Sequence, residues 1–429
     1  MAIITNLDRE KCYLDISIDE KPIGRIVIEL FNDLAPLSSE NFLKLCTGEA
    51  GKNAEGINLS FKGNYFHRAI KNFIIQAGDI VHCSDLQKYP PSADDLNIIG
   101  TGGASVYLDN DSDISDEVQL HNKFIDENLA NSTFETTFNV AMSNNDENSN
   151  TSQFFINTYP SPHLNNKHPI FGKVLHGKSV IREIENVPII SKDNYFPIVA
   201  VKIENCGKFE EGMEIPCYNA CYDTIGGDIY EEYPDDDSCF NKDDYAKVFK
   251  VCETIKNSGN CLFKSKDFKN CLFKFTKALR YVEELQPEKD VLITQSNTEQ
   301  QNLTNYKLYI DFLLLKKSLY SNMSLAYLKL EKYADSIKYS KFMIDMIELY
   351  PKYEPKFKVE KSDFVKCYYR IGKCYMLWNR LDKSKDFLTK ASDLNNQKDK
   401  LILKDLETVE NMIIQKEEGT KKSLAKFFQ

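Results

Sequence analysis

Apolar and polar residues alternate near the start of the chain as they do in β-strands. The segments Cys12–Ile18 and Gly24–Leu30 have a period of two, and the turn residues Asp19–Pro22 separate them. A helix is predicted over Ala35–Cys46, where Pro36 falls in the first turn, a position that tolerates proline. Further strand-like runs lie at residues 73–75, 137–141, 154–157, 170–174 and 198–205. Many short strands with few helices predict a closed or sandwiched β architecture.

From Ala246 onward the apolar pattern becomes helical, and it repeats. Units that begin at residues 252, 317 and 365 carry small residues at their eighth and twentieth positions and bulky ones at their eleventh. Small residues let the two helices of a unit approach closely, which is the principle of the 34-residue tetratricopeptide (TPR) repeat. The aligned residues are Gly259, Ser324 and Gly372 (eighth), Leu262, Tyr327 and Tyr375 (eleventh), Cys271, Ser336 and Ser384 (twentieth), and Ala278, Met343 and Ala391 (twenty-seventh).

The spacing of these units also predicts where the stack is lengthened and where it ends. Successive units lie 65 and 48 residues apart, so longer connections are expected at residues 286–305 and 350–362. A last helix, near residues 399–418, is expected to cap the open end of the stack. The chain therefore combines an N-terminal β domain with a C-terminal all-α TPR solenoid.

An acidic segment separates the two patterns. Residues 209–245 hold 12 acidic residues and one lysine, together with Gly226–Gly227 and the run Pro234–Asp237, a composition typical of a linker. The predicted division is a β domain at 1–208, an acidic linker at 209–245, three TPR units at 246–398, and a capping helix with its tail at 399–429.

Charge divides the chain at the same place. Residues 1–245 carry 19 Lys+Arg and 40 Asp+Glu, whereas residues 246–429 carry 35 and 24, within a formal net charge of −10. Opposite signs suggest two modules with different partners, the second of which favours an acidic ligand. A solvated helical surface that happens to be rich in lysine is the alternative.

Composition sets further bounds. With 429 residues, 42% of them apolar, the chain is long enough for two or three domains, and no run approaches 18 apolar residues, so no membrane association is expected. The start lacks the basic and apolar regions of a secretory signal. Twelve cysteines without a repeated pair are then most simply reduced thiols of a cytoplasmic protein.

Four segments of the first half bear a specific resemblance. They are Phe66–Asp79 (FHRAIKNFIIQAGD), Gly100–Gly103 (GTGG), Ser152–Ile156 (SQFFI) and Lys167–Gly172 (KHPIFG). Segments of this kind occur in this order in the cyclophilins, which are peptidyl-prolyl cis–trans isomerases, and roughly residues 8–208 are similar to that family. The resemblance implies a closed antiparallel β-barrel with capping helices.

Prolyl isomerisation suits residues of these types. Rotation about an X–Pro amide faces a barrier of about 18–20 kcal/mol, because resonance gives the C–N bond double-bond character. A cation near the prolyl nitrogen and an apolar pocket around the ring lower that barrier without a nucleophile. The resemblance implies that Arg68 is the cation. Around the substrate it implies Phe73, Ile74, Phe155, Leu164 and His168 in the ring pocket, Gln76 and the Asn144 backbone at the peptide carbonyls, and His67 beside the arginine.

Several positions depart from the family pattern. Ile74 stands where most active cyclophilins have Met, and Ser143 where they have Ala, so reduced activity is expected. His163 replaces the tryptophan that contacts cyclosporin, which implies weak binding of that drug. The loop Ile80–Ile99 is long, an acidic insertion occupies residues 109–122, and residues 145–151 replace a family loop; all three are expected to alter substrate preference.

Polar residues in the repeats form a second candidate site. Lys256 and Asn260 lie one helical turn apart, as do Lys366 and Arg370, and Asn322 occupies the corresponding position of the middle unit. Three cations and two amides that converge in a groove can hold a carboxylate terminus and an Asp side chain. These positions match the carboxylate clamp of TPR domains that bind the acidic tails of the 90-kDa and 70-kDa heat-shock chaperones. Chance placement in a Lys- and Asn-rich chain is the alternative.

The order of modules resembles that of TPR-containing cyclophilins of the cyclophilin-40 type. The resemblance implies a cytoplasmic co-chaperone that isomerises proline-containing clients and docks a heat-shock chaperone. A weakly active barrel that serves as an adaptor or holdase is the alternative. No cofactor or metal is expected, because the chemistry needs none and the six histidines lack metal-ligand spacing. Nucleic acid is not an expected partner, because no aromatic–basic recognition motif occurs.

Overall fold

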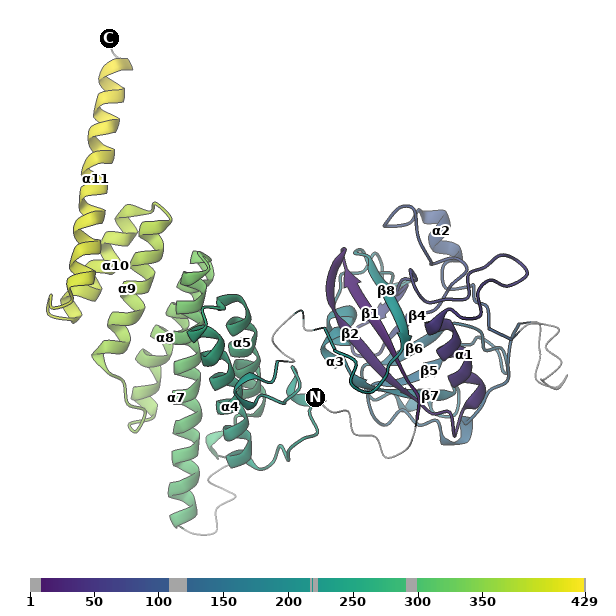
Figure 1. The fold of residues 1–429 in the computed structure, drawn as a ribbon. Helices are drawn as coiled ribbons and strands as arrows, with labels where there is room; N and C mark the ends of the chain where they lie inside the picture. Colours follow the sequence, from purple (N-terminus) through teal and green to yellow (C-terminus); the bar gives the residue numbers. More distant parts are fainter. Residues whose placement is uncertain (1–8, 108–121, 217, 219–222, 291–298, 428–429) are drawn as a thin grey trace. The chain divides into compact units, whose positions relative to one another are not determined.

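The structure is a computed structural model that describes residues 9–107, 122–216, 218, 223–290 and 299–427 (Figure 1). The chain forms two compact units, Met1–Tyr218 and Asn219–Gln429, and each is described here by itself. Most of the acidic insertion predicted at 109–122 and part of the connection predicted at 286–305 lie outside the described residues. Among the described helices, none has both the length and the apolar content needed to cross a membrane.

The first unit is a curled antiparallel sheet of eight strands in the order β3-β4-β6-β5-β7-β2-β1-β8. The strands are β1 (Lys11–Ile18), β2 (Lys21–Leu30), β3 (Arg68–Ile70), β4 (Ile74–Ala77), β5 (Asn139–Met142), β6 (Phe154–Asn157), β7 (Ile170–His176) and β8 (Val201–Lys208). Hydrogen bonds from Gly63 N to Ile203 O (2.8 Å) and from Phe66 N to Val201 O (2.9 Å) join the chain ahead of β3 to β8. The two edges therefore meet, and the predicted closed barrel is confirmed.

Helices cover the barrel, and aromatic rings fill it. Helix α1 (Pro36–Thr47) contacts β1, β7 and β8, while α3 (Lys178–Glu185) contacts β2, β3 and β4. The fully buried Phe42 of α1 lies 5.1 to 5.2 Å, between ring centres, from Phe61, Phe154 and Phe171. This core holds the strand ends of the barrel in fixed positions.

The strand predictions are confirmed with small shifts at their ends. The predicted run at 73–75 becomes β4 at Ile74–Ala77, and the run at 198–205 becomes β8 at Val201–Lys208. Strand β3 and helix α3 were not predicted from the pattern, because three residues are too few to show a period and an eight-residue helix carries few apolar positions.

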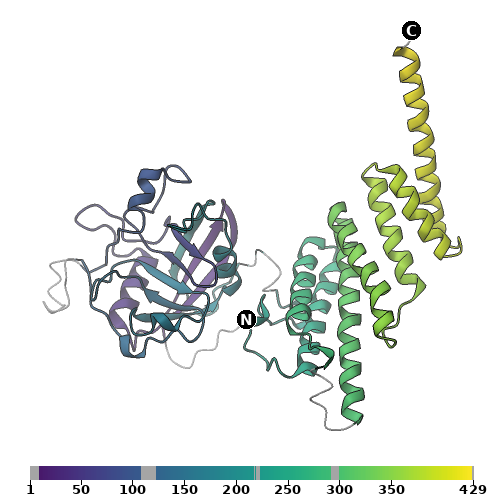
Figure 2. The same cartoon turned by 180° about the vertical axis from the view of Figure 1, so that it is seen from behind.

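The second unit is a stack of helix pairs followed by one long helix (Figure 2). The pairs are α4 (Tyr245–Lys264) with α5 (Phe268–Leu285), α7 (Glu299–Lys329) with α8 (Tyr333–Tyr353), and α9 (Lys361–Leu377) with α10 (Leu381–Leu394). Helix α11 (Lys400–Phe427) contacts α10 and α9 and runs on past the other helices in both views (Figures 1 and 2). The three predicted units and the final helix therefore agree with the structure.

Close contacts explain the small residues of the repeat. A Cβ added to Gly259 would lie 2.6 Å from the ring of Phe275, and one added to Gly372 would lie 2.7 Å from Leu388. In the middle unit, Ser336 Oγ donates to Ser324 O at 2.8 Å. Helix α7 begins at Glu299 and α8 ends at Tyr353, so helices take up part of both expected connections.

The segment predicted as an acidic linker makes specific contacts within each unit. Arg25 NH1 donates to Glu214 O at 3.1 Å on the barrel. In the helical unit, Asp228 is buried and forms ion pairs with Lys274 (2.6 Å) and Lys277 (2.9 Å) of α5, both of which are fully buried. The acidic composition alone predicts a solvated segment and could not show that Asp228 is buried with two lysines.

Candidate active site and helical groove

Adjacent strands bring three predicted residues into one row. Arg68 on β3 is paired with Gln76 on β4, and Gln76 is paired with Phe155 on β6. Residues directly opposite one another on neighbouring strands project from the same face of a sheet. The cation, the amide and the aromatic ring therefore lie side by side on that face.

Arg68 is held with part of its hydrogen-bonding capacity unused. Its side chain is half-buried, and its Nε is buried without a hydrogen-bond partner among the residues that the structure describes. The guanidinium carbon lies 5.8 Å from the centre of the Tyr195 ring, and Ala69 N donates to Tyr195 O at 3.0 Å. A buried donor without a partner in the free protein can be satisfied by a ligand.

Beside this row, apolar side chains form a separate cluster at the barrel surface. Its buried members include Ile74 and Phe155, and Phe73 and Leu164 pack against them as partly buried residues. The ring of Phe155 meets that of His168 edge-on at 5.3 Å between centres. His163 stacks on Phe73 at 5.2 Å. The structure thus brings together all the side chains predicted for the proline pocket.

Two series of hydrogen bonds border this apolar cluster. In one, His168 Nδ1 donates to Asn144 Oδ1 (3.0 Å), and Asn144 Nδ2 donates to Asp126 Oδ1 (2.8 Å). Burial is the main reason why the pKa of His168 lies below its ordinary value. The histidine is therefore a neutral, oriented wall of the pocket near pH 7.

The second series of hydrogen bonds includes Gln76. Its Nε2 donates to Ser143 Oγ (3.0 Å) and to Gln153 Oε1 (2.9 Å). Gln153 Nε2 in turn donates to Gly100 O (2.9 Å) and Gly102 O (2.6 Å). The amide group of Gln76 is therefore engaged within the protein, and a ligand that needs it has to compete with Ser143.

His67 lies behind the row of site residues. It is 5% exposed, and burial lowers its pKa to about 4, against a smaller opposing effect of the Asp79 carboxylate. His67, Arg68 and Gln76 also line a cavity of about 240 Å³ beside the row. The neutral imidazole thus adds no charge near Arg68 at neutral pH.

Gln153 and Asp126 are site residues that the motif analysis did not single out. Gln153 lies two positions before Phe155, and alternate residues of an extended segment share a face, so its position could have been predicted. Asp126 has no such signal, because only the tertiary fold brings it to Asn144. Both residues fix the orientation of a neighbour.

The predicted polar residues of the repeats lie on α4, α7 and α9. Asn322 Nδ2 donates to Asn260 Oδ1 at 3.0 Å, and this hydrogen bond joins the first two repeat units. Arg370 NH1 donates to the carbonyl oxygen of Ser321 at 2.7 Å and to its Oγ at 3.0 Å, which joins the third unit to the second. Burial lowers the pKa of Arg370. These three predicted residues therefore lie along one contiguous row of helices.

The lysines differ in their surroundings. Lys256 is half-buried one turn before Asn260. The Lys366 side chain is 54% exposed, and its Nζ lies 3.9 Å from Asp363, which also accepts from Lys317 at 2.8 Å. The ion pair of Lys317 with Asp363 joins α7 to α9, and no local sequence pattern could have predicted it.

Comparison with known proteins assigns the barrel. Residues 13–208 match the family described as cyclophilin type peptidyl-prolyl cis-trans isomerase/CLD. The chain is 43% identical to peptidyl-prolyl cis-trans isomerase CYP7 of Saccharomyces cerevisiae over 97% of this chain and 98% of that protein. It is 38% identical to peptidyl-prolyl cis-trans isomerase D of Kluyveromyces lactis over 65% of this chain and 68% of the relative. With its helix pairs following the barrel, the chain belongs to the cyclophilin family of peptidyl-prolyl cis–trans isomerases, among the TPR-containing members of the cyclophilin-40 type.

Proposed function

We propose that the row on β3, β4 and β6 is where this cyclophilin isomerises X–Pro bonds in client polypeptides. The proline ring enters the cluster of Phe73, Ile74, Phe155 and Leu164, and Arg68 approaches the prolyl nitrogen. Withdrawal of the nitrogen lone pair from the amide removes double-bond character and lowers the barrier to rotation. The observation that carries this proposal is the pairing of Arg68 with Gln76 beside the apolar cluster.

The remaining site residues orient the peptide in this proposal. The Asn144 backbone and Gln76 hold carbonyl groups on either side of the proline, and Ser143 sets how freely Gln76 does so. His168 closes the pocket over Phe155, while His163 extends it over Phe73. His67 supports Arg68 from behind as a neutral group.

An assay of X–Pro isomerisation on the intact protein tests the proposal. Arg68→Ala is expected to lower kcat/KM by about 10²-fold, the usual effect of losing one group that stabilises a transition state. Lys71→Ala is the matched control, since Lys71 is an exposed cation three residues away at the β3–β4 turn. Equal activity of the wild type and Arg68→Ala would exclude Arg68 from catalysis.

We propose further that the helical unit binds the acidic C-terminal tail of a heat-shock chaperone, of the 90-kDa or the 70-kDa class. Lys256, Asn260, Asn322, Lys366 and Arg370 would hold the terminal carboxylate and a neighbouring acidic side chain by charge-assisted hydrogen bonds. The supporting observation is the row of contacts that links Asn260 to Asn322 and Arg370 to Ser321. The buried cysteines are free thiols, which supports a reducing compartment such as the cytoplasm.

Calorimetry with an acidic chaperone-tail peptide tests the docking. Lys366→Ala is expected to weaken binding by about 1–3 kcal/mol, because it removes one charge-assisted hydrogen bond. Lys390→Ala is the control, since Lys390 is an exposed lysine on α10 whose Nζ lies 5.2 Å from the Phe387 ring centre. If Lys366→Ala and Arg370→Ala both bind as tightly as the wild type, the clamp does not exist.

One contact favours a second candidate function, that of a slow isomerase which acts chiefly as an adaptor or holdase. Gln76 is engaged by Ser143, where the family usually has alanine, so substrate binding carries an added cost. If Arg68→Ala loses isomerase activity but still functions in the chaperone complex, the adaptor is supported. If the variant loses both properties, the enzyme is supported.

A further inference from the structure

A cavity of about 240 Å³ opens beside Arg68, and the long loop of the barrel forms one of its walls. The loop contributes Leu96 of helix α2 (Ala93–Ile98) and Ile99, Gly100 and Thr101 that follow it. Asp193, Asn194 and Phe196, which precede β8, also line the cavity. Because Arg68 and Gln76 line the same cavity, a peptide held at the catalytic row also borders it.

Contacts at both ends hold the loop wall in place. Tyr89 OH donates to Pro197 O (2.8 Å) and Val199 O (3.0 Å). Leu96 and Ile99 pack against the cluster that contains buried Phe196. The wall is therefore part of the folded barrel.

Its catalytic end is fixed as well. Gly100 N donates to the fully buried Asp79 (2.7 Å), and Gly100 O accepts from Gln153, which also contacts Gln76. The distance between the loop wall and the catalytic row is therefore set by the fold.

The charges in the cavity are unevenly placed. Arg68 and Asp193 both line the cavity, and Asp193 supplies an exposed carboxylate. Asn194 Oδ1 already accepts from Phe196 N (3.1 Å) and Ser191 Oγ (3.2 Å), and His67 is neutral because burial depresses its pKa. The neighbouring Lys192 does not line the cavity. Among the residues that line this cavity, Leu96 and Ile99 are the partly exposed apolar side chains and Asp193 is the carboxylate.

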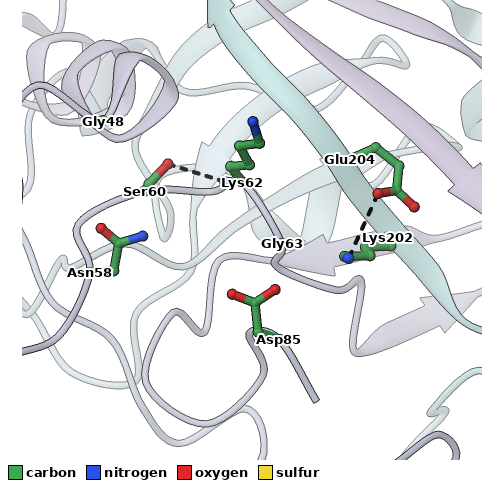
Figure 3. Close-up of a pocket in the computed structure, with 8 residues that line it drawn as sticks. All are labelled: Gly48, Asn58, Ser60, Lys62, Gly63, Asp85, Lys202 and Glu204. Atoms are coloured by element: carbon green, nitrogen blue, oxygen red, sulfur yellow. Dashed lines mark hydrogen bonds and ion pairs between the residues drawn. The ribbon is translucent and has the colours of Figure 1, made fainter. Parts of the chain in front are cut away.

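A second, larger cavity of about 470 Å³ lacks this organisation (Figure 3). It contains both signs of charge, and two of its charged residues, Lys202 and Glu204, already pair with each other at 3.7 Å. None of its lining residues belongs to the catalytic row. Its lining residue Asp85 provides a carboxylate outside the cavity beside Arg68, which is suitable for a control variant.

We propose that the cavity beside Arg68 is a specificity subsite for a long cationic side chain, lysine or arginine, close to the isomerised proline. Its aliphatic stem lies against the partly exposed Leu96 and Ile99, and its charged head reaches Asp193. Long basic side chains bury their stems on apolar surface while the head stays polar. A volume below the range of small-molecule pockets suits one side chain. The inference rests on the proposed function, since it places the proline at Arg68.

Peptides that differ at one residue near the proline test this subsite. Lys and Glu are placed in turn at each position from two before to three after the proline, and kcat/KM is measured with the full chain. At one of these positions, the ratio of kcat/KM for the Lys peptide to kcat/KM for the Glu peptide is expected to be higher in the wild type than in Asp193→Asn. The Lys/Glu ratio should fall about two- to fivefold in that variant, the range for a partly exposed ion pair. Arg68 is present in both proteins, so its own preference cancels.

Two matched variants make the result specific. Asp94→Asn removes a carboxylate from α2 that does not line the cavity, and Asp85→Asn removes one from the second cavity, so both should keep the wild-type ratio. A Lys/Glu ratio that Asp193→Asn leaves unchanged at every position overturns the subsite while leaving the isomerase intact. If no peptide is turned over faster than in Arg68→Ala, the proposed function fails instead.

Discussion

At the scale of single residues, Ser143 is the departure from the family pattern with the clearest structural consequence. Its hydroxyl accepts a hydrogen bond of 3.0 Å from the Gln76 amide, which in this position faces the proposed peptide. Alanine could not accept such a bond. A methyl group at this position would leave one donor of Gln76 free for a substrate carbonyl.

We therefore expect Ser143→Ala to raise kcat/KM by about two- to fivefold, because a net hydrogen bond of about 0.5–1 kcal/mol no longer competes with substrate. The same isomerisation assay measures it. Ser143→Thr keeps the hydroxyl and serves as the control. An unchanged or lower rate in Ser143→Ala would show that Ser143 does not restrain Gln76.

His67 makes the barrel sensitive to acid. Its pKa is about 4 in the folded protein because of burial, compared with 6.5 for an ordinary histidine. Between those values the unfolded chain binds a proton that the folded chain does not, so stability falls as pH decreases from 6.5 towards 4. The loss is at most a few kcal/mol, since one pKa unit corresponds to about 1.4 kcal/mol.

Calorimetry at pH 7 and pH 5 should show a smaller decrease in barrel stability for His67→Gln than for the wild type. His163→Gln is the matched control, since His163 is exposed and keeps contact with water in both states. Identical pH dependence in His67→Gln and the wild type would contradict this account.

At the scale of elements, the acidic segment forms a cover for the first helix pair. Asp228 pairs with two fully buried lysines of α5, and Tyr281 OH donates to the Asp237 carboxylate at 3.0 Å. A Cβ added to Gly226 would lie 2.9 Å from the Cα of Ser258 on α4, so the lack of a side chain at Gly226 lets the acidic segment approach that helix closely.

Removal of the Asp228 carboxylate should therefore destabilise the helical unit. Asp228→Ala removes the buried carboxylate with which both lysines form ion pairs, and the expected loss in the free energy of unfolding is about 3–5 kcal/mol. Denaturant unfolding followed by circular dichroism measures it. Asp235→Ala in the same segment is the control, since the Asp235 side chain is 86% exposed. Equal losses in the two variants would mean that the buried charges are not the cause.

At the scale of the whole molecule, the chain consists of two units with separate cores. The aromatic core around Phe42 belongs to the barrel, and the core around Phe275 and Leu319 belongs to the helices. The proposed catalytic row and the proposed clamp therefore stand on different hydrophobic cores. A substitution in one site is therefore expected to leave the core of the other unit unchanged.

The two activities should accordingly be separable in the full chain. Lys366→Ala is expected to keep wild-type kcat/KM on short proline peptides, and Arg68→Ala is expected to keep wild-type affinity for the chaperone tail. Both are measured on the same protein samples by the isomerase assay and calorimetry. A loss of both properties in either variant would contradict independent sites.

Site residues that lie close together in the sequence could be predicted from it, whereas those from distant segments could not. Arg68, Phe73, Ile74 and Gln76 lie within nine residues of one another, so a motif is enough to bring them together. The residues that orient them come from distant segments, as the contact of Asn144 with Asp126 and that of Gln153 with Gly100 show. No local pattern encodes such contacts, because they depend on how strands pair across the barrel.

The amino-acid pattern was enough to predict a β domain followed by a helical stack, because period-two and helical patterns are local properties of the chain. The small residues of the repeat were visible in the same way, since close helix contact requires them. The anchoring of the acidic segment, the contact of Ser143 with Gln76 and the position of Asp193 at the cavity beside Arg68 became apparent only in three dimensions. Each of these depends on residues far apart in sequence, and burial and charge pairing act through space.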